Sequence, residues 1–320
     1  MSWYLSFLAI LLNSLRIILA YFSSSLIIIW FIIELNLISF IGVIMFFPRK
    51  IAKSIAIKYF SFQVNVSVIL FLLVLLKGTF NVARATLMLR ILITKVGIAP
   101  FHLWFVSIIS KVEWPAFLWI AVPQKLIPLY MIRLSIINSV SILLLVLSVA
   151  VSLAHRIMQL KIKKVVALSS VFSLNWILLS IISSSGSWSL FFIIYRFFSR
   201  VLVLTLAQTV KRSSSCFQIT KPLSWLIIGL SLLLAGVPPR PLFFLKISII
   251  VEMINQGLEF MSVVMITASL IVLFMYINLI LNFLVFSHRS RSLRAQPNST
   301  NLVLLTYLFV VMVFYLVLFN

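Results

Sequence analysis

Residues 93–105 read ITKVGIAPFHLWF, an apolar run that contains a lysine, a proline and a histidine. A lysine at bilayer depth costs about 2.5–3.5 kcal/mol on insertion scales, so an ionisable residue kept there usually has a function. Pro100 follows Lys95 closely, and a proline removes a helical hydrogen bond. If this run lies in a membrane, it predicts a broken helix beside a charged side chain.

The composition places the chain in a membrane. It is 63% hydrophobic and 9% charged, with a mean hydropathy of +1.25, which excludes an ordinary soluble globule. The 26 Lys and Arg residues outnumber four acids, giving a net charge of +22. Nucleic-acid-binding proteins gather such charge on one soluble face, whereas here it is scattered between long apolar runs. We therefore expect membrane orientation by charge, and no nucleic-acid partner.

Several cofactor sites are not expected in this chain. Cys216 is the only cysteine, so neither an intrachain disulfide nor an iron–sulfur cluster can form from its own thiols. Cys and His residues show no metal-ligand spacing, and no glycine-rich nucleotide fingerprint occurs. The apolar start has no basic leader or small-residue cleavage site, so we expect a transmembrane span there.

Apolar runs of about 20 residues can cross the hydrocarbon core. The chain contains eleven candidates: 3–21, 24–47, 57–76, 84–109, 115–133, 138–158, 163–182, 187–209, 222–257, 260–286 and 300–319. They predict an all-α membrane protein with eleven transmembrane helices, forming a single transmembrane domain over residues 1–320.

Prolines predict interruptions in three of these spans. Pro100 lies in the fourth span, and Pro123 and Pro128 lie in the fifth. The ninth is too long for one straight helix, and Pro238 and Pro239 are expected to divide it.

Basic residues are unevenly divided between the connectors. Fifteen Lys and Arg residues follow the even-numbered spans, and only Lys77, Arg84 and Arg133 follow the odd-numbered ones. By the positive-inside rule, the even connectors and the N-terminus face the inner compartment and the C-terminus faces the outer one.

Four ionisable residues lie in the middle of predicted spans. They are Glu34, Lys95, Lys125 and Lys246, and each lysine has helix-breaking prolines close by. A broken helix exposes backbone groups that are tolerated where they border protein or a wet cavity. A single buried lysine could be a structural partner of Glu34, but three at similar depth indicate a polar track, a proton relay by type.

Three further polar residues are less decisive. His102 follows Lys95 by about two helical turns and could continue the track, but a hydrogen-bonded core histidine is an equal reading. Arg196 and Arg200 share one helical face, where a lipid phosphate or a neighbouring subunit could bind them.

Five stretches together resemble a known family. They are WFIIELNLISFIGVIMFFPRKIAKSIAIKYF (30–60), TKVGIAPFHLW (94–104), PQKLIPL (123–129), IKKVVALSSVFSLNWIL (162–178) and AGVPPRPLFFLK (235–246). In this order they resemble the antiporter-like membrane subunits of respiratory complex I, in their mitochondrial animal form. The resemblance implies eleven spans with the N-terminus in the matrix, the topology that the connectors also predict.

The resemblance also implies roles for the mid-span residues. Glu34 would pair with Lys95, Lys125 would be the central relay lysine, and Lys246 the terminal one. Partners would be the other complex I subunits, especially neighbouring antiporter-like subunits, and membrane lipids. FMN, iron–sulfur clusters and ubiquinone would be bound by those other subunits, and this chain would lie in the mitochondrial inner membrane without a redox site.

Some positions depart from the family pattern. PPRPLFF lacks the usual Thr-Gly after its paired prolines, and the connector AHRIMQLKIKK (154–164) lacks the family's glycines. A stand-alone cation/proton antiporter is the alternative function, since broken helices also suit secondary transport. A purely structural membrane scaffold is the third reading.

Overall fold

The computed structural model describes residues 12, 15–45, 50–75, 81–134, 140–159, 161–183, 186–212, 221–238 and 240–289. Over these residues the chain forms α-helices joined by short connections, with no strand. The helices are α2 (Leu26–Met45), α3 (Lys50–Leu75), α4 (Asn81–Val96), α5 (Leu103–Ile109), α6 (Trp114–Ala121), α7 (Pro123–Leu134), α8 (Val140–Ile157), α9 (Ile162–Ile182), α10 (Ser187–Arg212), α11 (Lys221–Ala235), α12 (Pro241–Asn255) and α13 (Glu259–Arg289). The all-α class predicted from the sequence is confirmed.

Each predicted span between residues 24 and 286 corresponds to one helix or to a pair of consecutive helices. The span 84–109 is divided into α4 and α5, 115–133 into α6 and α7, and 222–257 into α11 and α12. The last predicted span, 300–319, and most of the first, 3–21, lie outside the described residues.

Five helical segments among the described residues are long and apolar enough to cross a membrane, and one of them includes the turn between α6 and α7. They are Lys53–Leu75, Trp114–Leu134, Ile162–Ile182, Ser187–Gln208 and Glu259–Asn278. Interrupted helices such as α11 and α12, with 15 residues each, fall below that length individually. The chain is therefore a multi-pass membrane protein, and its count of crossings depends on how the interrupted helices are paired.

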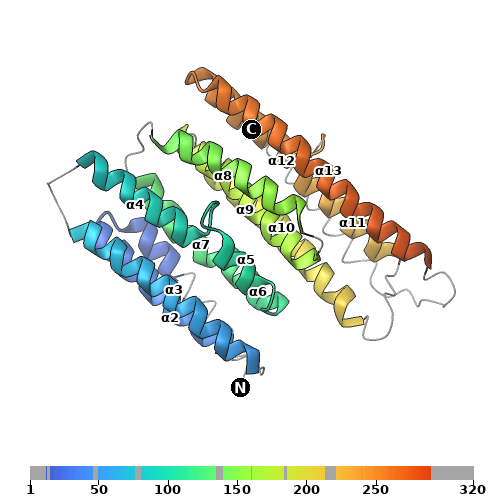
Figure 1. Cartoon of the computed structure of the whole chain (residues 1–320), viewed down its shortest axis with the longest axis horizontal. Helices are drawn as coiled ribbons and strands as arrows, with labels where there is room; N and C mark the ends of the chain where they lie inside the picture. The colour runs from blue at the N-terminus through green and yellow to red at the C-terminus, as the bar shows by residue number, and fades with distance from the viewer. Residues whose placement is uncertain are drawn as a thin grey trace. The chain divides into compact units, whose positions relative to one another are not determined.

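The chain consists of two compact units, Met1–Trp188 with Glu252–Ala268, and Ser189–Val251 with Ser269–Asn320. In the first unit α2 packs on α3, α3 on α4, and α7 contacts both α2 and α4 (Figure 1). The helices α5 and α7 also contact α9, which packs along α8. The two interrupted spans of this unit are therefore held between uninterrupted helices.

The helix α9 is buried along almost all of its length. It is apolar on all sides, as expected of a helix surrounded by other helices. Its serines satisfy themselves locally: Ser169, Ser170 and Ser173 donate hydroxyl hydrogen bonds to backbone carbonyls three residues earlier. No water is needed to satisfy these hydroxyl groups in an apolar interior.

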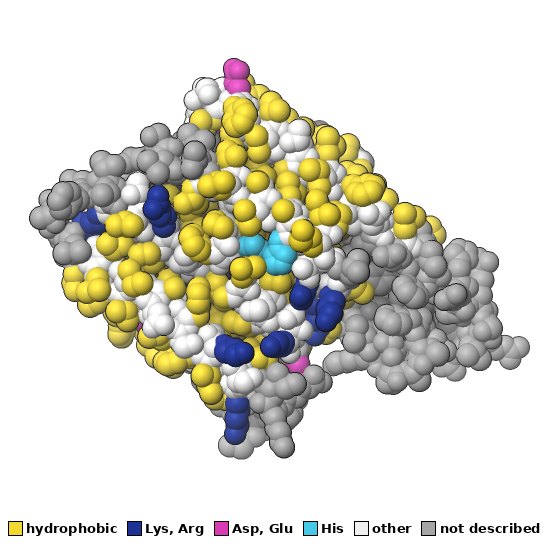
Figure 2. Space-filling model, in the orientation of Figure 1, with side chains coloured by type: hydrophobic (Ala, Val, Ile, Leu, Met, Phe, Trp, Pro, Cys, Tyr) yellow, Lys and Arg dark blue, Asp and Glu magenta, His cyan; other side chains and the backbone are white. Residues whose placement is uncertain are grey.

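The surface of the described residues is that of a membrane protein. The face in Figure 2 is covered mainly by hydrophobic side chains, with Lys and Arg confined to a few places. Large apolar residues such as Phe22, Ile57 and Phe260 are more than half exposed. Lipid tails can cover such side chains, whereas water would make them costly.

Candidate functional site

The candidate site begins where α4 ends. Gly97 has φ +77°, and a Cβ at this position would lie 3.2 Å from the Cβ of Phe105, so the turn requires glycine. Pro100 lies in the following non-helical turn, which confirms the predicted interruption there.

Side chains satisfy the carbonyls that this interruption leaves without helical donors. The indole of Trp104 donates to the Thr94 carbonyl at 3.0 Å, and the amide of Gln63 donates to the Lys95 carbonyl at 3.4 Å. The end of α4 is thus held open as a broken helix by specific polar contacts from α3 and α5.

Lys95, in the last turn of α4, forms an ion pair with Glu34 in the middle of α2. The Nζ–Oε1 distance is 3.1 Å, and the side chains are 3% and 20% exposed, respectively. The sequence predicted these two groups within about 6 Å of one another, and the structure confirms their proximity. Removing one partner of a buried pair leaves an uncompensated charge, so Glu34 and Lys95 depend on each other.

Lys125 lies at the second interruption. α6 ends at Ala121 and α7 begins at Pro123, so the break predicted at Pro123 is confirmed. The Lys125 side chain is buried, and its Nζ lies 3.7 Å from the centroid of the Phe105 ring. This cation–π contact joins the start of α7 to α5, and so connects the two broken helices.

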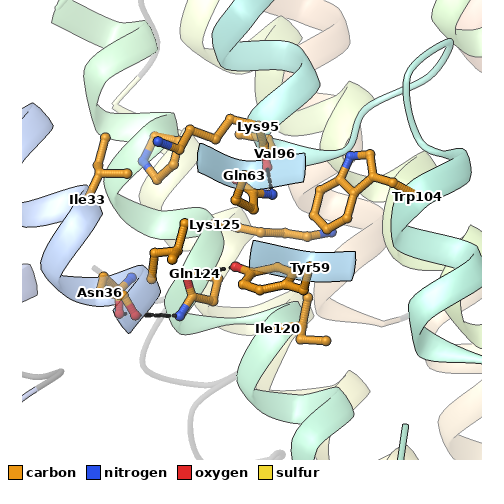
Figure 3. Close-up of a pocket in the computed structure, with 12 residues that line it drawn as sticks. Ile33, Asn36, Tyr59, Gln63, Lys95, Val96, Trp104, Ile120, Gln124 and Lys125 are labelled. Atoms are coloured by element: carbon orange, nitrogen blue, oxygen red, sulfur yellow. Dashed lines mark hydrogen bonds between the residues drawn. The ribbon is translucent and has the colours of Figure 1, made fainter. Parts of the chain in front are cut away.

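A small cavity joins Lys95 to Lys125. Its volume is about 10 Å³, at the lower limit of the space that one water needs. Figure 3 shows both lysines together with the polar side chains that surround the cavity. These are Asn36, Tyr59, Gln63 and Gln124, and the apolar remainder includes Ile33, Val96, Trp104 and Ile120.

Hydrogen bonds link three of the polar residues around this cavity. The Tyr59 hydroxyl donates to Gln124 Oε1 at 3.3 Å, and the Gln124 amide donates to the Asn36 carbonyl at 3.1 Å (Figure 3). The sequence analysis missed Asn36, Tyr59, Gln63 and Gln124. The sequence feature that could have identified them is an amide or a phenol within an otherwise apolar run. This pattern is typical of residues that form hydrogen bonds between helices in membranes.

The third lysine predicted for the relay, Lys246, lies in the second unit, where α11 and α12 meet. Lys246 donates from Nζ to the carbonyl of Ala235, the last residue of α11, at 2.9 Å. Gly236 has φ +80°, and a Cβ there would lie 2.7 Å from Lys246 Nζ. The ammonium group therefore caps the end of a broken helix, where carbonyls and a cation attract each other.

The remaining predicted breaks have different outcomes. Pro238 lies between α11 and α12, as expected, and Pro239 lies outside the described residues. The break predicted at Pro128 is wrong, because α7 continues through this residue to Leu134. A proline removes only its own N–H bond, and the contacts of α7 with its neighbours hold the helix together across the gap.

His102 is joined to a residue that the sequence analysis did not single out. Its Nε2 lies 2.7 Å from Nδ1 of His155, in the last turn of α8. His155 belongs to the segment 154–164, which departs from the family pattern. It is 53 residues from His102 in the sequence, so the sequence gave no reason to pair the two. Neither histidine belongs to a metal cluster, since the described residues contain no group of three or more suitable ligands.

The arginines of the second unit differ in exposure. Arg196 is buried, with its guanidinium 5.0 Å from the Phe192 ring and 5.6 Å from the Tyr195 ring, whereas Arg200 is exposed. Arg240, at the start of α12, donates to the Gly229 carbonyl in α11. Arg196 and Arg200, which the sequence places on one helical face, therefore have different environments.

With this geometry established, comparisons with known proteins identify similar chains. Residues 23–272 match the family model for the transmembrane part of NADH:quinone oxidoreductase/Mrp antiporter subunits. NADH-ubiquinone oxidoreductase chain 2 of Anopheles gambiae is 27% identical over 285 residues, covering 85% of this chain and 84% of that protein. The chain 2 protein of Myxine glutinosa is 30% identical over 280 residues, covering 81% and 79%.

Two solved structures share the fold. A chain in respiratory complex I from Thermus thermophilus with bound aureothin matches with a TM-score of 0.73 and 18% identity, over 91% of this chain and 71% of that chain. A chain in the Mrp complex from Dietzia sp. DQ12-45-1b matches with a TM-score of 0.74 and 16% identity, over 84% of this chain and 58% of that chain. The antiporter-like membrane fold predicted from the sequence is confirmed.

Proposed function

This chain belongs to the NADH:quinone oxidoreductase/Mrp antiporter family, and from that premise we propose that it is a proton-translocating membrane subunit of respiratory complex I. The observation that carries the proposal is the Glu34–Lys95 ion pair, which shares a small polar cavity with Lys125 between two broken helices. Relatives of similar length named NADH-ubiquinone oxidoreductase chain 2 favour this function over a stand-alone antiporter.

The mechanism follows from competition between charges. While Lys95 is bound to Glu34, its positive charge is balanced, and a proton on Lys125 meets little repulsion. When the pair loosens, the charge of Lys95 acts across the cavity and disfavours a second positive charge on Lys125. Lys125 then gives up its proton along the polar network, and re-formation of the pair restores its affinity.

Broken helices make this exchange possible at membrane depth. The side chains of Trp104 and Gln63 hold the end of α4 open, so that Lys95 can move without leaving helical carbonyls unsatisfied. Lys246 would be the terminal station of the relay, poised on the Ala235 carbonyl at the third interruption. His102 would be a further station beside the first interruption.

The proposal includes the placement of the chain. It forms a single transmembrane domain with eleven crossings in the mitochondrial inner membrane, its N-terminus in the matrix and its C-terminus in the intermembrane space. Its partners are the other subunits of complex I, especially the neighbouring antiporter-like subunits, and membrane lipids. FMN, iron–sulfur clusters and ubiquinone are bound by those subunits, so this chain supplies proton transfer without a redox site.

The experiment that tests the function replaces the central lysine. In the assembled complex in sealed vesicles, Lys125→Ala should reduce NADH-driven proton translocation while the complex still forms, as measured by native electrophoresis. Lys53→Ala is the matched control, because Lys53 is exposed and outside the cavity. Isolation of the chain without any redox assembly, or normal translocation in an assembled Lys125→Ala complex, would contradict the proposal.

A further inference from the structure

The two histidines that meet in the first unit belong to separate elements. His102 ends the turn after α4, and His155 lies in the last turn of α8. Their ring nitrogens Nε2 and Nδ1 are 2.7 Å apart, and the ring centroids are 4.9 Å apart. At this nitrogen–nitrogen distance one ring donates a hydrogen bond to the other, so a proton lies on the line between them.

The pair runs from the surface inward. His102 is 1% exposed, whereas His155 is only partly buried. Histidine reaches the face shown in Figure 2, which also carries Lys and Arg side chains. His155 is two residues from the end of α8, which leads into the basic connector that the positive-inside rule assigns to the inner compartment. The outer end of the pair therefore lies toward that compartment.

The inner end of the pair lies close in sequence to the cavity. Trp104, two residues after His102, borders the cavity between Lys95 and Lys125. Phe105, the next residue, carries the ring over which Lys125 Nζ lies at 3.7 Å. His102 Nδ1 is itself buried. His102 is thus within three residues, in sequence, of the side chains that border the cavity and contact Lys125.

We propose that His155 and His102 form a proton inlet from the inner compartment to the Lys95–Lys125 cavity. His155 takes up a proton on Nε2 and passes the one on Nδ1 to Nε2 of His102, which releases its own Nδ1 proton toward the cavity. Each ring gains one proton and loses one, so both rings are neutral again after the release, each in its other tautomer. This inference rests on the proposed function, because it supplies the proton that Lys125 transfers.

Charged neighbours suit a pair that passes a proton on. Arg156 follows His155 on α8, and Lys164, on α9, acts electrostatically on the His155 ring. Lys163 points elsewhere, since its Nζ donates to the Val112 carbonyl at 3.1 Å. Positive charge beside an imidazole disfavours a proton that rests there, and so favours transfer over storage.

Two conservative variants separate the hydrogen bond from proton transfer. His155→Asn places an amide near the former Nδ1, and His102→Gln places one near the former Nε2, so either can keep the contact without carrying a proton through the ring. In the assembled complex in sealed vesicles, both variants should retain assembly but lose most of their NADH-driven proton translocation. His288→Gln, which changes the only other histidine, should translocate protons like the wild type.

Lys125→Ala distinguishes failure of the inlet from failure of the proposed function. If Lys125→Ala stops translocation while His155→Asn and His102→Gln retain the wild-type rate, the inlet is wrong and the proposed function stands. If all three variants translocate normally, the proposed function fails, and the inlet with it. Should His155→Asn not assemble, His102→Gln gives the same decision from the buried end of the pair.

Discussion

Glu34 and Lys95 form an ion pair with unequal access to the surroundings. The Lys95 side chain is 3% exposed and that of Glu34 is 20% exposed, so the carboxylate retains some contact with the outside and the ammonium group almost none. A buried charge of this kind depends on its partner, because moving an isolated ion out of water costs several kcal/mol. Such a pair can keep Lys95 charged, while the Glu34 carboxylate can still respond to its surroundings.

Replacing the acid should therefore destabilise the lysine. We expect Glu34→Gln to lower the stability of the chain by about 3–5 kcal/mol, because the Lys95 ammonium loses its counter-charge. Thermal denaturation of the purified complex measures this. Glu34→Gln combined with Lys95→Gln should recover stability but not proton translocation, since no charge then remains to act on Lys125. A Glu34→Gln complex as stable as the wild type would show that the pair is not needed for stability.

Gly236 lies against Lys246, the lysine proposed as the end of the relay. Its φ of +80° disfavours any residue with a Cβ, and the added atom would lie 2.7 Å from Lys246 Nζ. We expect Gly236→Ala to displace the ammonium group from the Ala235 carbonyl and to lower proton translocation. Gly229→Ala, within the preceding helix α11, is the matched control, because a Cβ there meets nothing within 4 Å. Equal translocation in the two variants would contradict this reading.

The sequence predicted the ionisable residues of the site but not its neutral ones. A lysine or glutamate in an apolar run is visible because its burial is costly. Tyr59, Gln63 and Gln124 carry no charge, and single polar residues occur in many helices without lining a cavity. Their convergence on Lys95 and Lys125 depends on how α3 and α7 each pack against α2 and α4. The sequence of a single segment does not determine that packing.

The interrupted helices place a cation near carbonyls that lack helical donors. At the end of α4 the side chains of Trp104 and Gln63 satisfy such carbonyls, and at the end of α11 the Lys246 ammonium does so directly. The first arrangement leaves Lys95 available to Glu34, whereas the second engages the lysine itself. The same kind of interruption therefore supports two different lysine environments.

Removing Lys246 should affect α11 as an element. We expect Lys246→Ala to leave the Ala235 carbonyl without its donor, a loss of about 1–3 kcal/mol for a buried acceptor. The complex should still assemble, but with lower proton translocation and faster amide hydrogen exchange at the end of α11. Lys53→Ala, at an exposed position on α3, should change neither quantity. Unchanged translocation with normal assembly would reduce Lys246 to a packing residue.

Between residues 24 and 286, element boundaries followed from apolar length and proline position to within three residues, except that α3 begins at Lys50, seven residues before the predicted start of its span. Pro123 and Pro100 mark true interruptions: Pro123 follows the one-residue turn at Val122, and Pro100 lies three residues after Gly97, which has φ +77°. Pro128 has no such neighbour and lies inside α7. A proline alone therefore indicates a weak point, and the local backbone or its contacts decide whether the helix ends there.

At the scale of the whole molecule, the charge distribution organises the chain. With a net charge of +22, the basic residues are concentrated after the even-numbered spans, on the side that the positive-inside rule assigns to the inner compartment. A count based on helix length misses this order, since only five segments within the described part of the chain are long and apolar enough to span a membrane. The charge pattern is independent of helix length and supports pairing each interrupted helix into one crossing.

That topology predicts which side of the membrane reaches each connector. With Cys216 replaced by Ser, single cysteines introduced as Lys53→Cys, Lys161→Cys and Arg133→Cys give three labelling sites at exposed positions. A membrane-impermeant maleimide should label the first two only from the matrix side, because both follow even-numbered spans, and the third only from the opposite side. Agreement would show that the chain crosses the membrane an odd number of times between Lys53 and Arg133, as expected if α4 and α5 together form one of three crossings. Labelling of Lys53→Cys and Lys161→Cys from opposite sides would mean that an interrupted pair makes two crossings or none, and would remove the matrix placement of the His155 end of the inlet.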